Sequence, residues 1–331
     1  MSGKERIMAC AVLLVAAAGG LSAAEPFRLA IPRGLDLYVP TPEDNRLDRA
    51  KIDLGRKLFE DKRLSRDGST SCSVCHQAEH RFTITERFAK GIGDQPTERN
   101  PAALINRAYG QSFFWDGRAA TLEAQALEPI QNPKEMDLTL PELERRLKQH
   151  AEYPRLFRQA FGREPNREDV GRALAGFVRS LLSGDSAYDR YLFGDESALS
   201  ESAKRGLKLF QRKANCSTCH AGPNLTDERF HNTGVAWRDG GLQDVGRFAV
   251  TKQEQDRGAF KTPTLRDVAL TAPYMHDGSI PTLEKVIERY SNGGIKNPHL
   301  DEEIRPLNLN ADEQRDLLAF LESLTGRDVR R

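Results

Sequence analysis

Two short segments of this 331-residue chain, 72–76 and 216–220, share the pattern Cys-x-x-Cys-His. Thiols at this spacing, with a histidine directly after them, form the attachment signature of a c-type haem: each thiol becomes a thioether and the histidine ligates iron. One copy alone would leave open a redox or zinc pair. Two copies, each followed by histidine, predict two covalent haem c groups. The attachment residues are Cys72, Cys75 and His76 in the first copy and Cys216, Cys219 and His220 in the second.

The remaining one of the 5 cysteines, Cys10, lies in an N-terminal stretch that reads as a signal peptide. Charged residues open the stretch, an apolar run follows at 8–18, and small residues precede Glu25. The run is too short to span a bilayer. Residues 1–24 are therefore predicted to be cleaved, which leaves a mature protein without a membrane span. We expect that protein in the periplasm, because c-type haem is attached outside the bacterial cytoplasm.

The elements around the two motifs also repeat along the chain. An amphipathic segment ending in Leu-Phe precedes each motif, at 54–59 and 205–210, and an apolar pattern with helical spacing closes each unit, at 169–182 and 311–324. This order is typical of a small cytochrome c. The sequence therefore predicts a mainly α fold of two cytochrome c-like domains, with strand-like material only in short pieces such as 248–251.

Glycine, serine and acidic residues interrupt the helical pattern near 183–194, where we place the domain boundary. The ~305 residues after the signal peptide suit two domains of roughly 100–200 residues each. The predicted domains are 25–188, with the first haem, and 189–331, with the second. The net charge of +1 gives no reason to expect a nucleic acid or an anionic membrane as partner.

Further motifs occur in a fixed order along the chain. They are Arg-Leu-Ser-Arg-Asp-Gly at 63–68, Arg-Asn-Pro at 99–101, Phe-Trp-Asp-Gly-Arg-Ala at 114–119, Gln125, Pro129, Glu-Met at 135–136, Asp-Val-Gly-Arg at 244–247, Phe-Lys-Thr-Pro-Thr-Leu-Arg at 260–266 and Pro-Tyr-Met-His-Asp-Gly at 273–278. In these marks the chain, from about Lys51 to Gly326, resembles the bacterial di-haem cytochrome c peroxidases, in the branch that includes MauG. The resemblance implies an oxidoreductase whose first haem meets hydrogen peroxide. Its second haem would receive electrons from a small cytochrome c or cupredoxin.

The resemblance also assigns roles to single residues. Glu135 and Gln125 are expected over the distal face of the first haem, where a carboxylate with a raised pKa can relay a proton between the peroxide oxygens. Trp115 is expected between the two porphyrins as an electronic bridge. His276 is expected to hydrogen-bond at the haem–haem interface. One Ca²⁺ is implied at the Asn100 side chain and the backbone carbonyls of Thr271 and Pro273, which are the oxygen donors that this ion prefers.

The chain departs from typical members of the family at both haems. Typical members carry a distal histidine between two glycines, where this chain has Gly91-Ile92-Gly93. Ile92 cannot ligate iron, so we expect an open first haem at rest. Typical members ligate the second haem with a methionine, whereas MauG-like members use a tyrosine. Tyr290 is the predicted sixth ligand here, and Met275 is the alternative.

The resemblance leaves three functions open. The first is a peroxidase that reduces hydrogen peroxide. The second is a MauG-like enzyme that oxidises a protein side chain or an organic substrate through a high-valent di-haem state. MauG draws electrons through a surface tryptophan, and this chain has Ala214 at the corresponding position. The third is a di-haem electron carrier, against which the expected open haem beside Glu135 argues.

Overall fold

The computed structural model of the chain describes residues 27–326, so the predicted signal peptide lies outside the described residues. These residues are mainly helical, as predicted. The α-helices are α1 (Arg49–Glu60), α2 (Cys72–Cys75), α3 (Leu122–Gln131), α4 (Leu140–Gln149), α5 (Tyr153–Phe161), α6 (Arg167–Arg179), α7 (Ala187–Leu192), α8 (Glu201–Gln211), α9 (Phe248–Thr251), α10 (Leu283–Ser291) and α11 (Ala311–Glu322). The strands β1 (Phe230–His231), β2 (Trp237–Arg238), β3 (Gly241–Leu242) and β4 (Phe260–Lys261) pair antiparallel as β1–β4 and β2–β3.

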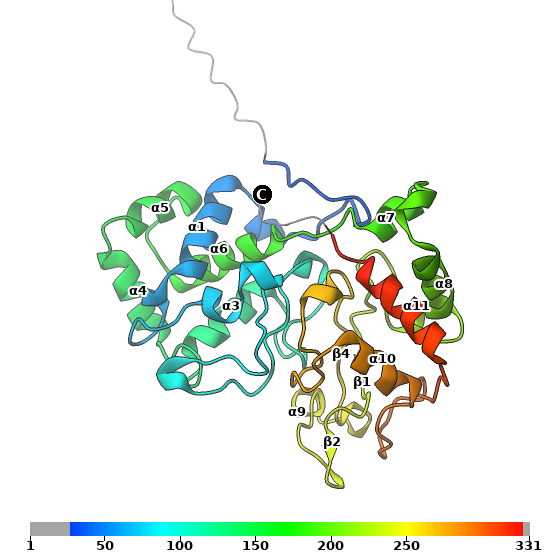
Figure 1. Cartoon of the computed structure of the whole chain (residues 1–331). Coiled ribbons are helices and arrows are strands. Elements are labelled where there is room, and N and C mark those ends of the chain that lie inside the picture. Colours follow the sequence, from blue (N-terminus) through cyan, green and yellow to red (C-terminus); the bar gives the residue numbers. More distant parts are fainter. Residues whose placement is uncertain (1–26, 327–331) are drawn as a thin grey trace, which may run out of the picture.

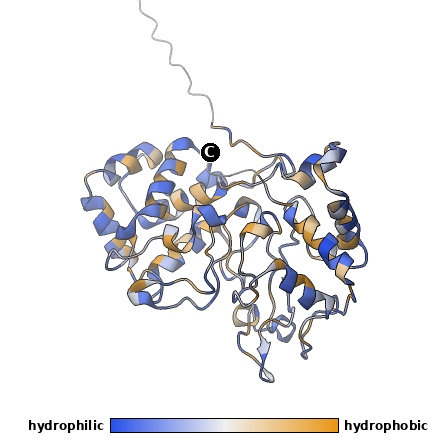
Figure 2. Ribbon diagram, viewed as in Figure 1, coloured by the Kyte–Doolittle hydropathy of each residue, from blue (hydrophilic) through white to orange (hydrophobic). Residues whose placement is uncertain are grey.

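Two groups of helices lie side by side, each around its own apolar core (Figure 1). One group contains α1 and α3 to α6, and the other contains α7, α8, α10 and α11. Apolar and polar segments alternate along these helices (Figure 2), as expected of helices that bury one face. The long irregular segments of both groups run into the space between them. Within the described residues, no helix combines the length and apolarity needed to cross a bilayer.

The sequence repeat corresponds to a repeated helix crossing. Helix α1 packs on α6 in the first group, and α8 packs on α11 in the second. Each crossing depends on a glycine: a Cβ on Gly55 would lie 2.0 Å from the carbonyl oxygen of Ala173, and one on Gly206 would lie 1.9 Å from that of Asp316. Only a residue without a side chain lets the backbones approach this closely.

Paired aromatic rings complete each crossing. Phe59 of α1 lies 5.1 Å from Phe177 of α6, and Phe210 of α8 lies 5.0 Å from Phe320 of α11, measured between ring centroids. Such contacts stabilise a pair beyond the area that it buries. Phe59 and Phe210 are the last residues of the Leu-Phe segments that precede the two motifs. The same crossing therefore places each Cys-x-x-Cys-His segment.

The structure corrects some element boundaries and one element type. The closing helices predicted at 169–182 and 311–324 end earlier, at Arg179 and Glu322. The strand predicted at 248–251 is wrong, because this segment forms the short helix α9. A brief apolar run cannot be assigned from periodicity alone. Here Gly246, with φ +58°, pairs with Ala259 and turns the chain, so the run folds back instead of extending.

An N-terminal strap, residues 27–39, crosses from the first helix group to α7 (Figure 1). Arg266 joins the strap to the second group: its guanidinium donates to the carbonyl oxygen of Gly34 at 2.7 Å and to both carboxylate oxygens of Asp189 at 2.7 and 2.9 Å. Its Nε–H also donates to the carbonyl oxygen of Pro223, in the loop after the second motif. Both Arg266 and Asp189 are buried.

Candidate active site

Each of the two Cys-x-x-Cys-His segments folds into a tight turn of its own. The backbone N–H of His76 donates to the carbonyl oxygen of Cys72 at 2.9 Å, and that of His220 donates to Cys216 at 2.9 Å. The first turn is helix α2, and the second contains the 3₁₀ helix η7 (Cys216–Thr218). Helical turns place positions i, i+3 and i+4 on one face, so the two thiols and the imidazole of a motif point the same way.

Each motif histidine has one ring nitrogen held by a backbone carbonyl. The Nδ1 of His76 lies 2.8 Å from the carbonyl oxygen of Phe82, and that of His220 lies 3.1 Å from Leu225. A carbonyl only accepts, so Nδ1 carries the hydrogen and the lone pair remains on Nε2. Burial lowers the pKa of both imidazoles, which favours the neutral, metal-binding form. Such second hydrogen bonds are typical of metal-bound histidines.

The four motif thiols are half-buried. All four are free of disulfides. Burial raises the pKa of Cys72 to about 12, of Cys75 to about 11 and of Cys216 to about 12. Reactive and metal-binding cysteines have lowered values instead. Half-buried thiols on the same face of a turn as a histidine fit covalent attachment of a porphyrin.

One continuous cavity of ≈ 700 Å³ extends from the first motif to the second. Its wall includes Cys75 and His76 from one motif and Cys216, Cys219 and His220 from the other. All the remaining residues that the sequence assigned to the site also line it: Asn100, Trp115, Gln125, Glu135, Thr271, Pro273, His276 and Tyr290. Cys72 packs against the core of the first helix group. The fold thus gathers residues more than 200 positions apart around one space that suits two porphyrins.

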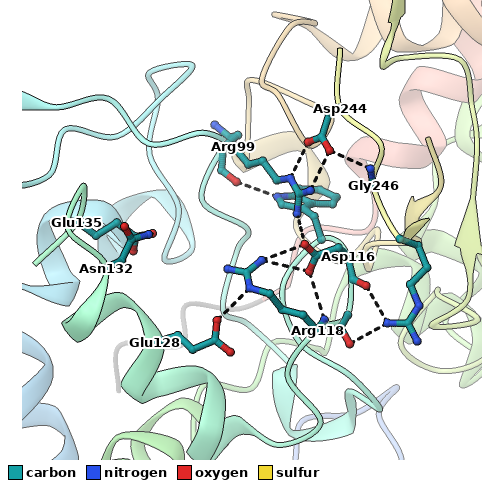
Figure 3. A network of polar contacts seen from close by, with 12 residues as sticks. Arg99, Asp116, Arg118, Glu128, Asn132, Glu135, Asp244 and Gly246 are labelled. Carbon is teal, nitrogen blue, oxygen red and sulfur yellow. Dashed lines mark hydrogen bonds and ion pairs between the residues drawn. The ribbon is translucent and has the colours of Figure 1, made fainter. Parts of the chain in front are cut away.

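The candidate distal residues come from α3 and the turn after it. Gln125 and Pro129 lie one helical turn apart on α3, and Glu135 follows in a turn closed by its own N–H on the carbonyl oxygen of Asn132. The Asn132 side chain donates from Nδ2 to Oε1 of Glu135 at 2.7 Å, while its Oδ1 accepts the N–H of Lys134 at 3.0 Å. Figure 3 shows the Asn132 and Glu135 side chains together.

Glu135 is placed to hold and release a proton. Burial raises its pKa, and this effect outweighs the lowering by the Asn132 hydrogen bond and by the nearby Arg118. The carboxyl therefore takes up a proton more readily than an exposed glutamate. Lys134 and Glu98 form an ion pair beside it, which keeps the lysine ammonium on the Glu98 carboxylate.

The segment 91–93 lies directly against Glu135. Ile92 is 1% exposed, and its N–H donates to the carbonyl oxygen of Glu135 at 2.8 Å. A Cβ on Gly91 would lie 2.0 Å from the carbonyl oxygen of Lys134, so only glycine allows this approach. The buried apolar side chain of Ile92 thus lies in a segment fixed against the acid.

Trp115 is fixed between the two halves of the molecule. Its indole N–H donates to the carbonyl oxygen of Asn100 at 2.8 Å, and its own carbonyl oxygen accepts the N–H of Lys261 at 2.8 Å. The next residue, Asp116, accepts from Arg99 at 2.6 Å, and Arg99 also binds Asp244 of the second half through two hydrogen bonds (Figure 3).

This network continues on the first-half side of Trp115. Arg118 contacts Asp116 and donates to Glu128 of α3 at 2.9 Å. Arg247, from the second half, donates to the carbonyl oxygens of Asp116 and Gly117. Charged and backbone groups from both halves therefore hold the segment around Trp115 in place.

The wall near the second motif offers two candidate iron ligands. Tyr290, on α10, and Met275 both line the cavity. Burial raises the pKa of the Tyr290 phenol to about 12, so a strong Lewis acid is needed to deprotonate it. His276 is 5% exposed and its ring stacks on Phe260 at 3.6 Å. Burial lowers the pKa of His276 to about 4, so this imidazole is neutral.

Three wall residues carry chemistry that the sequence did not assign. Lys261 lies in the motif at 260–266 but had no role there, and Asn132 lies between Pro129 and Glu135 without having been singled out. His231 lies between two carboxylates, with Nδ1 2.6 Å from Asp301 and Nε2 3.0 Å from Asp227. Ligand atoms of Cys219, Asp227 and His231 lie within 4.8 Å of one another. We assign no separate metal site to them, because the haem motif uses Cys219 and both nitrogens of His231 are engaged.

Comparisons with known proteins agree with this geometry. A family profile described as "Di-haem cytochrome c peroxidase" matches residues 49–197, and one described as "RoxA-like, cytochrome c-like" matches residues 259–291. The "Methylamine utilization protein MauG" of Methylorubrum extorquens is 44% identical over 86% of this chain and 81% of its own length. The "Cytochrome c551 peroxidase" of Pseudomonas aeruginosa is 35% identical over 89% of this chain and 86% of its own length. The chain belongs to the di-haem cytochrome c peroxidase/MauG family.

A solved member of the family has the same fold. The crystal structure of a MauG-like protein associated with microbial copper homeostasis superposes with a TM-score of 0.81 at 35% identity, covering 92% of this chain and 96% of that one. The family membership predicted from the sequence is thereby confirmed. It makes the protein an oxidoreductase with haem c cofactors, built from cytochrome c-like domains.

Proposed function

We propose that the protein is a periplasmic di-haem c-type peroxidase, which reduces hydrogen peroxide with electrons from a small cytochrome c or cupredoxin. One observation carries this proposal: the carboxyl of Glu135, with its raised pKa, shares a cavity with His76, and the neighbouring Ile92 offers no ligand. Relatives named cytochrome c peroxidase support it. An electron carrier needs no acid beside an open iron, so that function explains the buried Glu135 less well.

The residues of the first half would hold and protonate the peroxide. Cys72, Cys75 and His76 would hold the first haem, which supplies the redox chemistry that cleaves the O–O bond. Glu135 would take the proton from the inner oxygen of the peroxide and return it to the outer oxygen, which leaves as water. Gln125 lines the same wall and would orient the peroxide by hydrogen bonding. Asn132 would hold the carboxyl in place.

The second half would receive the electrons. Cys216, Cys219 and His220 would hold the second haem, with Tyr290 as its sixth ligand and Trp115 as the bridge towards the first. We keep the division into domains at 25–188 and 189–331. The two separate apolar cores support two domains, and α7, which begins at Ala187, packs against the second core.

A calcium site at Asn100, Thr271 and Pro273 is also part of the proposal. The Asn100 side chain donates from Nδ2 to the carbonyl oxygens of Glu86 and Arg87, at 3.2 and 3.1 Å. Its Oδ1 is thereby turned away from those acceptors and is available as a hard oxygen ligand. Thr271 and Pro273 lie on the same cavity wall. Chelation is expected to change the haem spectra.

The test is steady-state peroxide turnover by the haem-loaded protein with a reduced cytochrome c as donor. Glu135→Gln keeps the shape of the side chain but cannot relay a proton, so turnover should fall by about 10²–10⁴-fold. The matched control is Glu79→Gln, a change to an exposed acid close to the first motif. Full activity in Glu135→Gln would sink the proposed role of the acid.

The second candidate function is MauG-like oxidation of a protein side chain or an organic molecule. Relatives named MauG and the phenol of Tyr290 in the cavity favour it. Ala214 weighs against the route through a surface tryptophan, because this position is buried as well as apolar. Negligible turnover, together with a long-lived spectral change after stoichiometric peroxide, would favour this candidate over the peroxidase.

A further inference from the structure

Two cations and a single carboxylate are buried together in the wall of the central cavity. Arg107, in the 3₁₀ helix η5 (Arg107–Tyr109), donates to Glu228 through Nη1 at 2.7 Å and Nη2 at 3.1 Å. Lys261, on β4, places its Nζ 3.7 Å from the same carboxylate. Arg107 is 7% exposed, and Glu228 and Lys261 are 8% exposed. When Lys261 is protonated, the cluster has one more positive than negative charge in a region where charge is costly.

Glu228 does not satisfy the lysine. Its two oxygens already accept both Arg107 donors, and the backbone N–H of Gln111 donates to one of them at 3.3 Å. The 3.7 Å separation from Lys261 is too long for a hydrogen bond. Burial and the Arg107 charge lower the pKa of Lys261 to about 7, although Glu228 opposes this. An ammonium in such a place calls for a second anion.

The backbone of Lys261 is held by contacts with β1 and with Trp115. Pairing of β4 with β1 sets the backbone, and the N–H of Lys261 donates to the carbonyl oxygen of Trp115. The preceding residue, Phe260, stacks on His276. The side chain lines the cavity that contains both haem motifs, and Arg107 lines it too. Lys261 has only the long ion pair with Glu228, so a second anion that could hydrogen-bond to its Nζ would enter from this cavity.

We propose that Lys261, supported by Arg107, forms a carboxylate-binding site at the centre of the cavity, between the two haem motifs. The carboxylate comes either from a porphyrin propionate or from a small free anion such as formate. The proposal rests on the haem occupancy assumed in the proposed function, but not on peroxide chemistry. A cation held here stabilises the reduced form of the nearer haem, because reduction adds negative charge.

The test is a spectroelectrochemical titration of both haems in the haem-loaded protein without peroxide. Lys261→Met keeps an unbranched side chain, one atom shorter, and removes the charge, so the midpoint potential of at least one haem should fall. Lys261→Arg should retain the wild-type value. Lys208→Met removes the same charge from an exposed position on α8 and should change nothing. Wild-type potentials in Lys261→Met would overturn the proposal.

Added formate separates the two sources of the carboxylate. If a propionate occupies the site, formate leaves the wild-type potentials unchanged while Lys261→Met still lowers one of them. If the site takes a free anion, formate lowers a wild-type potential and has no effect in Lys261→Met. Either pattern supports a carboxylate site, whereas equal formate responses in the wild type and Lys261→Met would count against it.

A second variant covers the case in which Lys261→Met fails to load haem. Glu228→Gln removes the competing negative charge from the same cluster, so a midpoint potential should rise instead of falling. Unchanged potentials in Glu228→Gln would then overturn the proposal. Because no peroxide is present, a protein without peroxidase turnover could still pass this test, and the two proposals fail separately.

Discussion

At the scale of single residues, Asn132 determines which oxygen of Glu135 can carry a proton. Its Oδ1 accepts the backbone N–H of Lys134, so its Nδ2 must face Glu135 as a donor. A donor against Oε1 disfavours a proton on that oxygen, which leaves Oε2 as the protonation site. The amide thus acts as a positioning group for the proton relay.

Asn132→Asp should raise the pKa of Glu135 further, because it replaces the donor with a second carboxylate next to the first. The charges already facing Glu135 are Arg118, Glu128 and Glu98. The infrared C=O band of the protonated acid, identified by its loss in Glu135→Gln, should persist to higher pH. The control, Gln131→Glu, adds the same charge at the neighbouring exposed position. Identical titrations of Asn132→Asp and the wild type would rule out the positioning role.

The two candidate sixth ligands of the second haem, Tyr290 and Met275, can be distinguished by substitution. If the phenolate is the sixth ligand, Tyr290→Phe should abolish the low-spin spectrum of that haem, and Met275→Leu should preserve it. The reverse pattern would assign the iron to Met275. Absorption and electron paramagnetic resonance spectra of the ferric protein distinguish the two cases without any turnover measurement.

At the scale of elements, the two glycine crossings should be intolerant of any side chain. Gly206→Ala places a methyl group against the carbonyl oxygen of Asp316, so α8 and α11 must separate. We expect the free energy of unfolding to fall by about 1–3 kcal/mol, the usual cost of overpacking. Urea denaturation measures this change.

Gly176→Ala is the matched control for this helix packing. The glycine lies within α6, but its added Cβ would meet Leu47 at an ordinary 3.7 Å. Alanine favours a helix over glycine by about 0.5–1 kcal/mol, so this variant should be slightly more stable than the wild type. Equal losses in Gly176→Ala and Gly206→Ala would show that close approach is not the cause.

The sequence predicts the parts of the site that local chemistry specifies. The five consecutive residues of Cys-x-x-Cys-His are enough to predict haem attachment. A Leu-Phe segment precedes each copy, so two cytochrome c-like units could be inferred. The Arg107–Glu228–Lys261 cluster could not, because Arg107 and Glu228 lie 121 positions apart. The orientation of the Asn132 side chain depends on the backbone N–H of Lys134, which residue types do not reveal. Nor do residue types reveal the turn at Gly246, after which residues 248–251 form a helix.

At the scale of the whole molecule, the buried Arg266–Asp189 pair joins the strap to the second half. Burial alone would raise the pKa of Asp189, but hydrogen bonds from Arg266 and Ser186 bring it below its ordinary value. The pair therefore stabilises the fold fully above the ordinary carboxyl pKa of about 4. This contribution is lost as the pH falls through the lower folded value.

Asp189→Asn should remove that acid-sensitive contribution and leave a buried, unpaired guanidinium. We expect a loss of about 3–5 kcal/mol in the free energy of unfolding at neutral pH, and a flatter dependence between neutral and acid pH. Urea denaturation at several pH values measures both. Asp195→Asn, at an exposed carboxylate, is the control and should follow the wild type. An unchanged acid dependence in Asp189→Asn would assign the effect to other groups.

The shared cavity also bears on how the protein is made. Its walls come from both halves, so the space closes only when the halves have docked. The four thiols are half-buried, and three of them line this space, so we expect the haems to be attached before the two halves dock. Chain compaction and cofactor capture are then one coupled event. A substitution that speeds docking of the two halves should therefore lower the fraction of haem-loaded protein and leave unmodified thiols.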